Sequence, residues 1–325
     1  MQAIVFSQYG PPEHLELKEV PQPTPKDDEV LVRVHASSIN SWDWEFLNGT
    51  PFINRLLFGL LKPKRGKRIL GADIAGTVAA VGRHVMRFQP GDAVFGDLWD
   101  NWGGFAEYAC APETALETKP AAATFEEAAA VPQAGVLALQ GLRTTGKIRS
   151  GQNVLINGAG GGVGTFAVQI AKRAGTEVTG VDAAHKLHAV RALGADHVID
   201  YAREDFTQTG DRYDLILDCQ GYRSMFDYKG ALVPGGTYAM VGGPLPRILQ
   251  LLCLNLWAPL TRESRNLRLV AEGPNKGLAD LKALIETGQL TPVIDRTYPL
   301  SEVPDALRYF GQGHHKGKIV ITMNI

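Results

Sequence analysis

A glycine-rich turn between an apolar strand and an amphipathic helix is the feature that most constrains the fold. The stretch "VLINGAGGGVGTFAVQIAK" runs from Val154 to Lys172. After the turn, apolar residues recur at helical spacing over positions 163–174, and Gly175 ends the pattern. A strand, a glycine turn and a helix in this order are typical of a phosphate-binding turn in a parallel sheet.

The turn departs from the strict G-x-G-x-x-G pattern, because Ala159 stands at the usual first glycine. The physical requirements still hold. Gly161 lets the backbone approach a pyrophosphate, and Gly164 lets the helix pack closely on the strand. A second strand ends at Asp182, 18 residues after Gly164, where a carboxylate suits a ribose hydroxyl. The stretch therefore predicts a dinucleotide-binding turn that includes Gly161, Gly162, Val163 and Gly164.

The rest of the chain divides into two textures. Residues 1–120 contain short β-type runs bounded by Gly and Pro, which favours a compact barrel-like domain. From Asn153 strands alternate with helices, which predicts a parallel sheet covered on both faces. The tail from Lys276 is expected to hold one helix, "LADLKALIETG", some turns and a final strand, "GKIVITM".

Composition excludes several function classes. The formal net charge is −1, from 33 basic and 34 acidic side chains, so nucleic-acid binding is not expected. The three cysteines lie far apart, which favours a reducing, cytoplasmic compartment over a disulfide framework. The N-terminus does not resemble a signal peptide, and no apolar run reaches the ~18–20 residues that span a bilayer.

Two apolar segments, residues 51–61 and 245–260, stand apart from this pattern. The first precedes "KPKRGKR", which carries five positive charges in seven residues. Core helices or oligomer interfaces are one interpretation of both segments. A lid over an apolar substrate pocket, or a patch that contacts a membrane surface, is the other.

A family resemblance covers the whole chain. Its motifs include "EVLVRVHASSINSWDW", "LGADIAGTVAAVG", "PGDAVFGD", "GQNVLINGAGGGVG", "ALGADHVIDY", "VPGGTYAMVGG" and "GKIVI". With them the chain resembles a zinc-free medium-chain dehydrogenase/reductase of the quinone oxidoreductase, or zeta-crystallin-like, family. The resemblance implies an α/β protein with a GroES-like β-barrel catalytic domain, residues 1–120 and 273–325, and a Rossmann cofactor domain, residues 121–272. It also implies a homodimer.

The positions of the zinc ligands carry information about the reaction. Zinc-dependent members of the superfamily place a Cys and a His where this chain has Asn40 and Ala72. A catalytic zinc needs about three converging protein ligands, so no metal is expected. Without zinc, hydride transfer to an electron-poor acceptor is favoured, such as a quinone or a C=C bond conjugated to a carbonyl.

The resemblance also assigns roles at the catalytic centre. Asn40 stands where the family keeps an Asn beside the nicotinamide, with a loop cap as the structural alternative. Asp43 follows at the spacing of the family's N-x-x-D motif and is expected to orient its neighbours. Trp42, Trp44 and Phe46 are candidate walls of the substrate pocket, or plain core residues. No general acid is evident, and solvent is one source of the proton.

The same resemblance extends the predicted cofactor site beyond the turn. Asp182 and Lys186 are expected to bracket the adenosine ribose, and Tyr201 resembles the family's adenosine-side Tyr. Further predicted cofactor-binding residues are Gly242, Gly243 and Lys318. One departure is Leu137, where relatives often carry Thr.

The cofactor preference follows from two opposing arguments. The resemblance favours NADP(H), whereas Asp182 favours NAD(H) because its charge would repel a 2′-phosphate. Lys186 and His185 offset that charge, and NADP(H) is the prediction.

Two functions of different classes are consistent with these residues. The first is NAD(P)H-dependent reduction of quinones or α,β-unsaturated carbonyls. The alternative is a crystallin-like protein that binds a nucleotide for a structural or regulatory role with little turnover.

Overall fold

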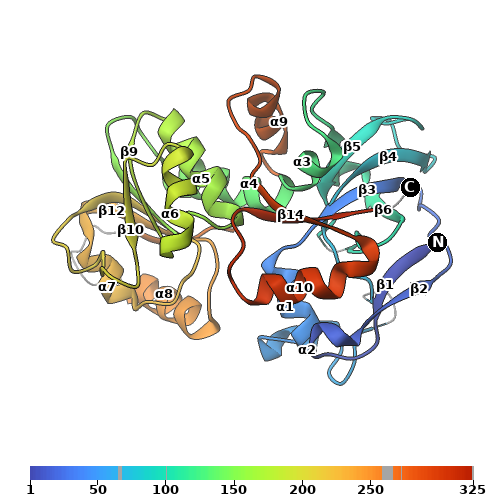
Figure 1. The fold of residues 1–325 in the computed structure, drawn as a ribbon, viewed down its shortest axis with the longest axis horizontal. Helices are drawn as coiled ribbons and strands as arrows, with labels where there is room; N and C mark the ends of the chain where they lie inside the picture. The colour runs from blue at the N-terminus through green and yellow to red at the C-terminus, as the bar shows by residue number, and fades with distance from the viewer. Residues whose placement is uncertain (65–67, 100, 258–265, 272, 324–325) are drawn as a thin grey trace. The chain divides into compact units, whose positions relative to one another are not determined.

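The computed structural model describes residues 1–64, 68–99, 101–257, 266–271 and 273–323. The chain divides into two compact units, and both chain ends lie in the same one (Figure 1). The first unit comprises Met1–Val136 and Pro274–Ile325, and the second comprises Leu137–Gly273. The domain boundaries predicted from the resemblance, at residues 120 and 273, stay a prediction.

The first unit is built on antiparallel β-structure. Its main sheet has the strand order β14-β15-β3-β4-β5-β7, with β6 paired to β3 on the side, and β1 and β2 form a separate pair. The strands are β1 (Gln2–Phe6), β2 (Leu15–Glu19), β3 (Glu29–Ser38), β4 (Asp73–Val81), β5 (Ala93–Asp97), β6 (Tyr108–Pro112), β7 (Glu117–Thr118), β14 (Ile294–Pro299) and β15 (Lys318–Thr322). The C-terminal strand β15 pairs with β3, so residues from both ends of the chain share one sheet.

The first unit also contains several helices. They are α1 (Ser41–Asn48), α2 (Phe52–Phe58), α3 (Phe125–Ala129), α9 (Leu278–Glu286) and α10 (Val303–Gly311), and α4 (Pro132–Leu139) spans the boundary between the units. Helix α3 begins after Thr124, whose hydroxyl accepts a hydrogen bond from the Glu127 amide, as its Thr-x-x-Glu pattern predicts.

Helix α10 corrects the expectation of a single helix in the C-terminal tail. Pro304 lies in the first turn of this helix, where a missing N–H costs no hydrogen bond. The helix buries Val303, Ala306 and Leu307 on one face. The spacing of these three residues was a helical signal in the sequence.

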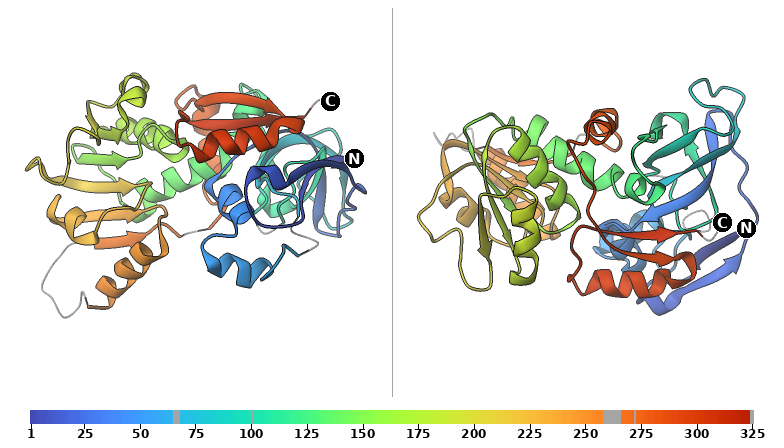
Figure 2. Two further views of the ribbon diagram at one scale, coloured as in Figure 1. Left: turned by 60° about the horizontal axis from the view of Figure 1, so that its bottom comes forward. Right: turned by 45° about the horizontal axis from the view of Figure 1, so that its top comes forward.

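The second unit is a parallel sheet with helices on both faces (Figure 2). Its strand order is β10-β9-β8-β11-β12-β13, so the chain starts in the middle of the sheet and winds outward in both directions. The strands are β8 (Asn153–Asn157), β9 (Glu177–Asp182), β10 (His197–Asp200), β11 (Tyr213–Asp218), β12 (Leu232–Met240) and β13 (Asn266–Leu269). The helices are α5 (Gly162–Arg173), α6 (Ala184–Ala192), α7 (Met225–Gly230) and α8 (Leu245–Trp257).

This strand order is that of a Rossmann fold, and it fixes where a ligand binds. The winding direction reverses between β8 and β11, and ligands of such sheets bind beyond the carboxyl ends of the strands at that point. The glycine turn follows β8 directly. The predicted α/β class with a Rossmann sheet is therefore confirmed.

Helices α2 and α8 lie within the two unusual apolar segments, and each exposes apolar side chains. Residues 258–260 of the second segment lie outside the described residues. Phe52 is 62% exposed, and Leu61, just beyond α2, is 87% exposed. On α8, Leu251 is buried whereas Leu245 and Leu249 are exposed. Burial within their own unit therefore does not account for all of their apolar residues. No helix among the described residues is long and apolar enough to cross a membrane.

Candidate active site

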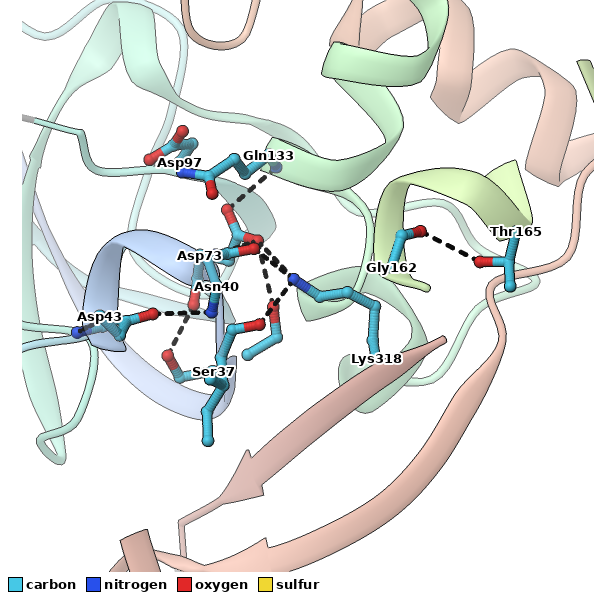
Figure 3. Close-up of polar contacts among 12 residues, drawn as sticks. Ser37, Asn40, Asp43, Asp73, Asp97, Gln133, Gly162, Thr165 and Lys318 are labelled. Atoms are coloured by element: carbon cyan, nitrogen blue, oxygen red, sulfur yellow. Dashed lines mark hydrogen bonds and ion pairs between the residues drawn. The ribbon is translucent and has the colours of Figure 1, made fainter. Parts of the chain in front are cut away.

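The glycine turn brings the end of β8 against the start of α5. Gly158 has a φ of 83°, a conformation that disfavours a side chain. A Cβ on Gly164 would lie 2.1 Å from the carbonyl oxygen of Gly158, so helix and turn approach too closely for any other residue. In the first turn of α5 the Thr165 hydroxyl donates to the Gly162 carbonyl at 3.0 Å (Figure 3). The first amides of a helix have no partner inside it and are available to an anion.

Asp182, at the end of β9, holds the turn in place. Its Oδ2 accepts a hydrogen bond from the Gly160 amide at 2.8 Å, and its Oδ1 accepts one from the Ala183 amide at 2.8 Å. The Lys186 ammonium lies 3.7 Å from Oδ1, and both side chains are almost fully buried. The charge of Asp182 is thus offset by an adjacent cation, as the sequence suggested.

These residues fit a dinucleotide. Cβ atoms placed on Gly161 and Gly242 would find, respectively, one backbone atom at 3.4 Å and no atom within 4 Å, so space for a ligand lies beside both. By contrast, a Cβ on Gly243 would lie 2.5 Å from the Met240 methyl, so close packing against Met240 requires a glycine here. Tyr201 lies after β10 and is 56% exposed.

In the first unit the structure joins Asn40, Asp73 and Lys318 into one buried cluster (Figure 3). The Asn40 Nδ2 donates to Asp73 Oδ2 at 2.9 Å, and the Lys318 ammonium donates to Asn40 Oδ1 and lies 3.5 Å from Asp73 Oδ2. Asp73 also accepts hydrogen bonds from the Ser38 hydroxyl at 3.1 Å and from the backbone N–H of Gln133 at 3.0 Å. We call Asn40, Asp73 and Lys318 the Asn40 cluster.

Asp43 and Asp97 add two more buried carboxyl groups beside it. Asp43 accepts hydrogen bonds from the amides of Asn40 and Gly71, each at 2.8 Å, and so fixes the start of α1. Burial raises the pKa of Asp43 to about 7. Burial, together with the charge of Asp73, raises the pKa of Asp97 to about 7 as well. Asp43 thus holds the backbone amides of Asn40 and Gly71, and its role at the catalytic centre stays a prediction.

The cluster places opposite charges in a dry environment. Burial lowers the pKa of Lys318, and the charges of Asp73, Asp43 and Asp97 oppose that effect. Burial raises the pKa of Asp73, and Lys318 and the Asn40 amide oppose it. A buried charge of either sign is costly unless it is paired and hydrogen-bonded, so Lys318 and Asp73 depend on each other.

The predicted pocket residues lie in an aromatic group of the same unit. Trp42 stacks on Phe46 with ring centroids 5.9 Å apart and lies 4.6 Å from the ring of Trp99. Phe46 is buried in the core, and Trp44 packs so closely on Gly311 that a Cβ there would lie 2.4 Å from its ring. The half-buried Trp42 is the member best placed to contact a ligand.

A cavity of about 200 Å³ lies next to this group. Asp97, Trp99, Asn101 and Asn275 contribute to its lining. Trp42 contacts it only through Trp99, and the other two predicted pocket residues do not line it.

The described residues contain no group of His, Cys, Asp and Glu side chains arranged to hold a metal ion. Of the two positions that would carry zinc ligands, Asn40 belongs to the Asn40 cluster, and Ala72 directly precedes Asp73 in the chain. The absence of zinc from the protein itself stays a prediction for metal analysis.

Two family models match the chain, and with the fold they define a medium-chain dehydrogenase/reductase. One, the alcohol dehydrogenase GroES-like domain, matches residues 26–121. The other, described as a zinc-binding dehydrogenase, matches residues 193–321.

Relatives that match along the full length narrow the assignment. A chloroplast envelope quinone oxidoreductase homolog from Arabidopsis thaliana is 32% identical over 99% of this chain and 98% of its own. An NADPH-dependent alkenal/one oxidoreductase from the same plant is 29% identical over 99% of this chain and 79% of its own. The solved structure of the quinone oxidoreductase from Coxiella burnetii superimposes with a TM-score of 0.87 at 30% identity and covers 99% of both chains. The chain therefore belongs to the zinc-free quinone oxidoreductase family, and it is an oxidoreductase.

Asp73 is the residue that the sequence-based prediction missed. It follows Ala72 in "GAD", and no role was predicted for it from the sequence. Lys318 was predicted from the resemblance to bind the cofactor, whereas the structure places its ammonium against Asn40 and the Ile39 carbonyl, 3.0 Å away. An acidic residue at the start of a buried strand was the signal available for Asp73.

Proposed function

We propose that the protein reduces quinones or α,β-unsaturated carbonyls with a nicotinamide cofactor as the hydride donor. The observation that carries this proposal is the match to quinone oxidoreductases along nearly the whole of both chains. A relative named as an alkenal/one oxidoreductase supports the second class of acceptor. Nothing in the comparisons favours the alternative of a nucleotide-binding protein without turnover.

The cofactor would bind at the glycine turn. Gly162, Val163 and Gly164 would hold its pyrophosphate through the first amides of α5, and Gly161 would let the pyrophosphate approach the backbone. Gly242 would leave room for the nicotinamide half. A bound reduced nicotinamide supplies a hydride to an electron-poor carbon.

The acceptor oxygen gains negative charge as the hydride arrives, and a fixed hydrogen-bond donor stabilises it without a metal. We assign this role to the side-chain amide of Asn40, in line with its family position beside the nicotinamide. Trp42 offers a ring on which a planar acceptor can stack. The proton that completes the reduction comes from solvent in this proposal.

The environment of Asp182 weakens the main argument against NADPH, the cofactor that the family resemblance favours. A bare carboxylate at this position would repel a 2′-phosphate. Here the carboxylate is engaged by two backbone amides and faces the Lys186 ammonium. NADPH therefore meets a carboxylate whose charge is largely offset.

The reaction is tested by following NADPH oxidation by the purified protein. The acceptors are 1,4-benzoquinone, 9,10-phenanthrenequinone and an alkenal, and NADH is compared under the same conditions. We expect steady turnover with at least one acceptor and a higher kcat/KM for NADPH. Cofactor binding without turnover on the whole panel contradicts the proposed reaction, and a strong preference for NADH contradicts the proposed cofactor.

A homodimer, a cytoplasmic location and contact with a membrane surface remain to be tested separately. The apolar side chains exposed on α8 suit a dimer contact, and light scattering of the purified protein gives the oligomeric state. Those near α2, followed by Lys62 and Lys64, suit the membrane alternative. Absence of co-sedimentation with anionic liposomes removes that alternative.

A further inference from the structure

The side-chain amide of Asn40 is held at both of its ends. Its nitrogen donates to the Asp73 carboxylate, and its oxygen accepts from the Lys318 ammonium. An amide nitrogen cannot accept a hydrogen bond and an amide oxygen cannot donate one. Rotation of the amide by half a turn would therefore place its NH₂ group against the Lys318 ammonium and its oxygen against the Asp73 carboxylate, and both hydrogen bonds would be lost. The two charges select one orientation of the amide.

Asp73 is in turn fixed by groups from several elements. The backbone N–H of Gln133, at the start of α4, and the Ser38 hydroxyl, at the end of β3, both donate to its carboxylate. Its side chain is completely buried, as is almost all of Lys318. This carboxylate accepts more hydrogen bonds than a protonated acid or an amide could accept at the same place.

We propose that Asp73 is a positioning residue for the reaction and acts by fixing, together with Lys318, the orientation and polarity of the Asn40 amide. This inference rests on the proposed function. An amide nitrogen carries two protons, of which one bonds to Asp73. The ammonium at the amide oxygen strengthens the remaining N–H as a donor, whereas the carboxylate at the other N–H weakens it. The pair therefore acts mainly by fixing the direction of the remaining N–H.

The variant Asp73→Asn tests this relation. Asn has one acceptor oxygen in the side chain, so the side-chain amide of Asn40 and the backbone N–H of Gln133 would compete for it. We expect kcat to fall about 10- to 100-fold, the effect of losing one hydrogen bond to a charged group, with KM for NADPH changed less than about threefold. We also expect kcat to decline at a lower pH on the alkaline side, because Lys318 then keeps only Asp43 and Asp97 as nearby carboxylates.

A double-mutant cycle separates positioning from a general loss of structure. If Asp73 acts through Asn40, the variants Asn40→Ala and Asn40→Ala/Asp73→Asn have the same kcat. The control is Glu29→Gln, which removes a different buried carboxylate, at the start of β3. Glu29 is paired with Lys26 and is not part of the Asn40 cluster. We expect wild-type kcat and pH profile for the control. Independent, multiplicative losses for Asn40→Ala and Asp73→Asn overturn the inference.

A second readout does not depend on turnover. The Nδ2 protons of Asn40, assigned by their disappearance in Asn40→Ala, should exchange slowly with solvent in the wild type and quickly in Asp73→Asn. Equal protection in both proteins overturns the inference even if the proposed function fails. If Asp73→Asn does not fold, Asp73→Asn/Lys318→Met removes both charges together and leaves neither unpaired. Slow exchange of the Asn40 side-chain amide in that variant would also overturn the inference.

Discussion

A single methyl group added at Gly164 tests whether the glycine turn binds the cofactor. In Gly164→Ala the new Cβ would lie 2.1 Å from the Gly158 oxygen and 2.6 Å from the Ala159 Cα. Both are backbone atoms of a turn held by Asp182, so α5 and the turn must separate by about 1 Å to restore ordinary contact.

The energetic cost follows from two opposing effects. Forcing apart a well-packed contact costs about 3 kcal/mol at the upper end of the usual range. Replacing Gly by Ala inside a helix returns about 1 kcal/mol. The net loss of about 2 kcal/mol should lower Tm by roughly 4–8 °C. The same displacement moves the first amides of α5 away from the pyrophosphate, so we expect KM for NADPH to rise about tenfold or more.

The assay is thermal unfolding together with NADPH titration of Gly164→Ala and two matched variants. Gly230→Ala and Gly242→Ala both place a Cβ where no atom lies within 4 Å. Gly230→Ala should keep both the Tm and the affinity for NADPH. Gly242→Ala should keep the Tm but weaken NADPH binding, since its methyl group would point into space assigned to the cofactor. Wild-type stability and affinity in Gly164→Ala would refute the reasoning.

Three further predictions concern charge and metal. Lys186→Met should lower kcat/KM for NADPH more than for NADH, because it leaves Asp182 without its cation; an unchanged ratio of the two constants contradicts this. Asp43 has an ordinary pKa of 3.8 and a folded pKa of about 7, so between those values the native state holds a proton that the unfolded state has lost. The free energy of unfolding should therefore fall as the pH rises through this window, and urea titrations of Asp43→Asn should show a shallower slope than the wild type; an equal slope excludes Asp43 as the cause. Elemental analysis of the purified protein should find no stoichiometric zinc, and tightly held zinc would refute the assignment of Asn40 and Ala72 as non-ligands.

The glycine turn and its neighbours could be predicted because their constraints are local. The strand, the close approach at Gly164 and helix α5 lie within some twenty consecutive residues, and each requirement leaves a mark on its own position. The end of β9 at Asp182 follows from the same regular alternation. Helix α10 was not predicted, although the spacing of Val303, Ala306 and Leu307 is an equally local helical signal.

The Asn40 cluster could not be derived in this way. Asn40, Asp73 and Lys318 come from the start of α1, from β4 and from β15, and 245 residues of chain separate Asp73 from Lys318. No periodicity or spacing links them, and the family resemblance assigned Lys318 to the cofactor. The pairing of β15 with β3 brings the ammonium beside the amide.

The sequence by itself therefore determined the two kinds of domain, the dinucleotide-binding turn and the loss of the zinc ligands, since each depends on residue types at neighbouring positions. Only the tertiary structure decided which charges face Asn40, that Asp182 accepts from the Gly160 amide, and that Phe46 is buried whereas Trp42 and Trp44 stay half-buried. Charges of opposite sign attract across any sequence separation once the chain is folded, and burial then makes their pairing obligatory.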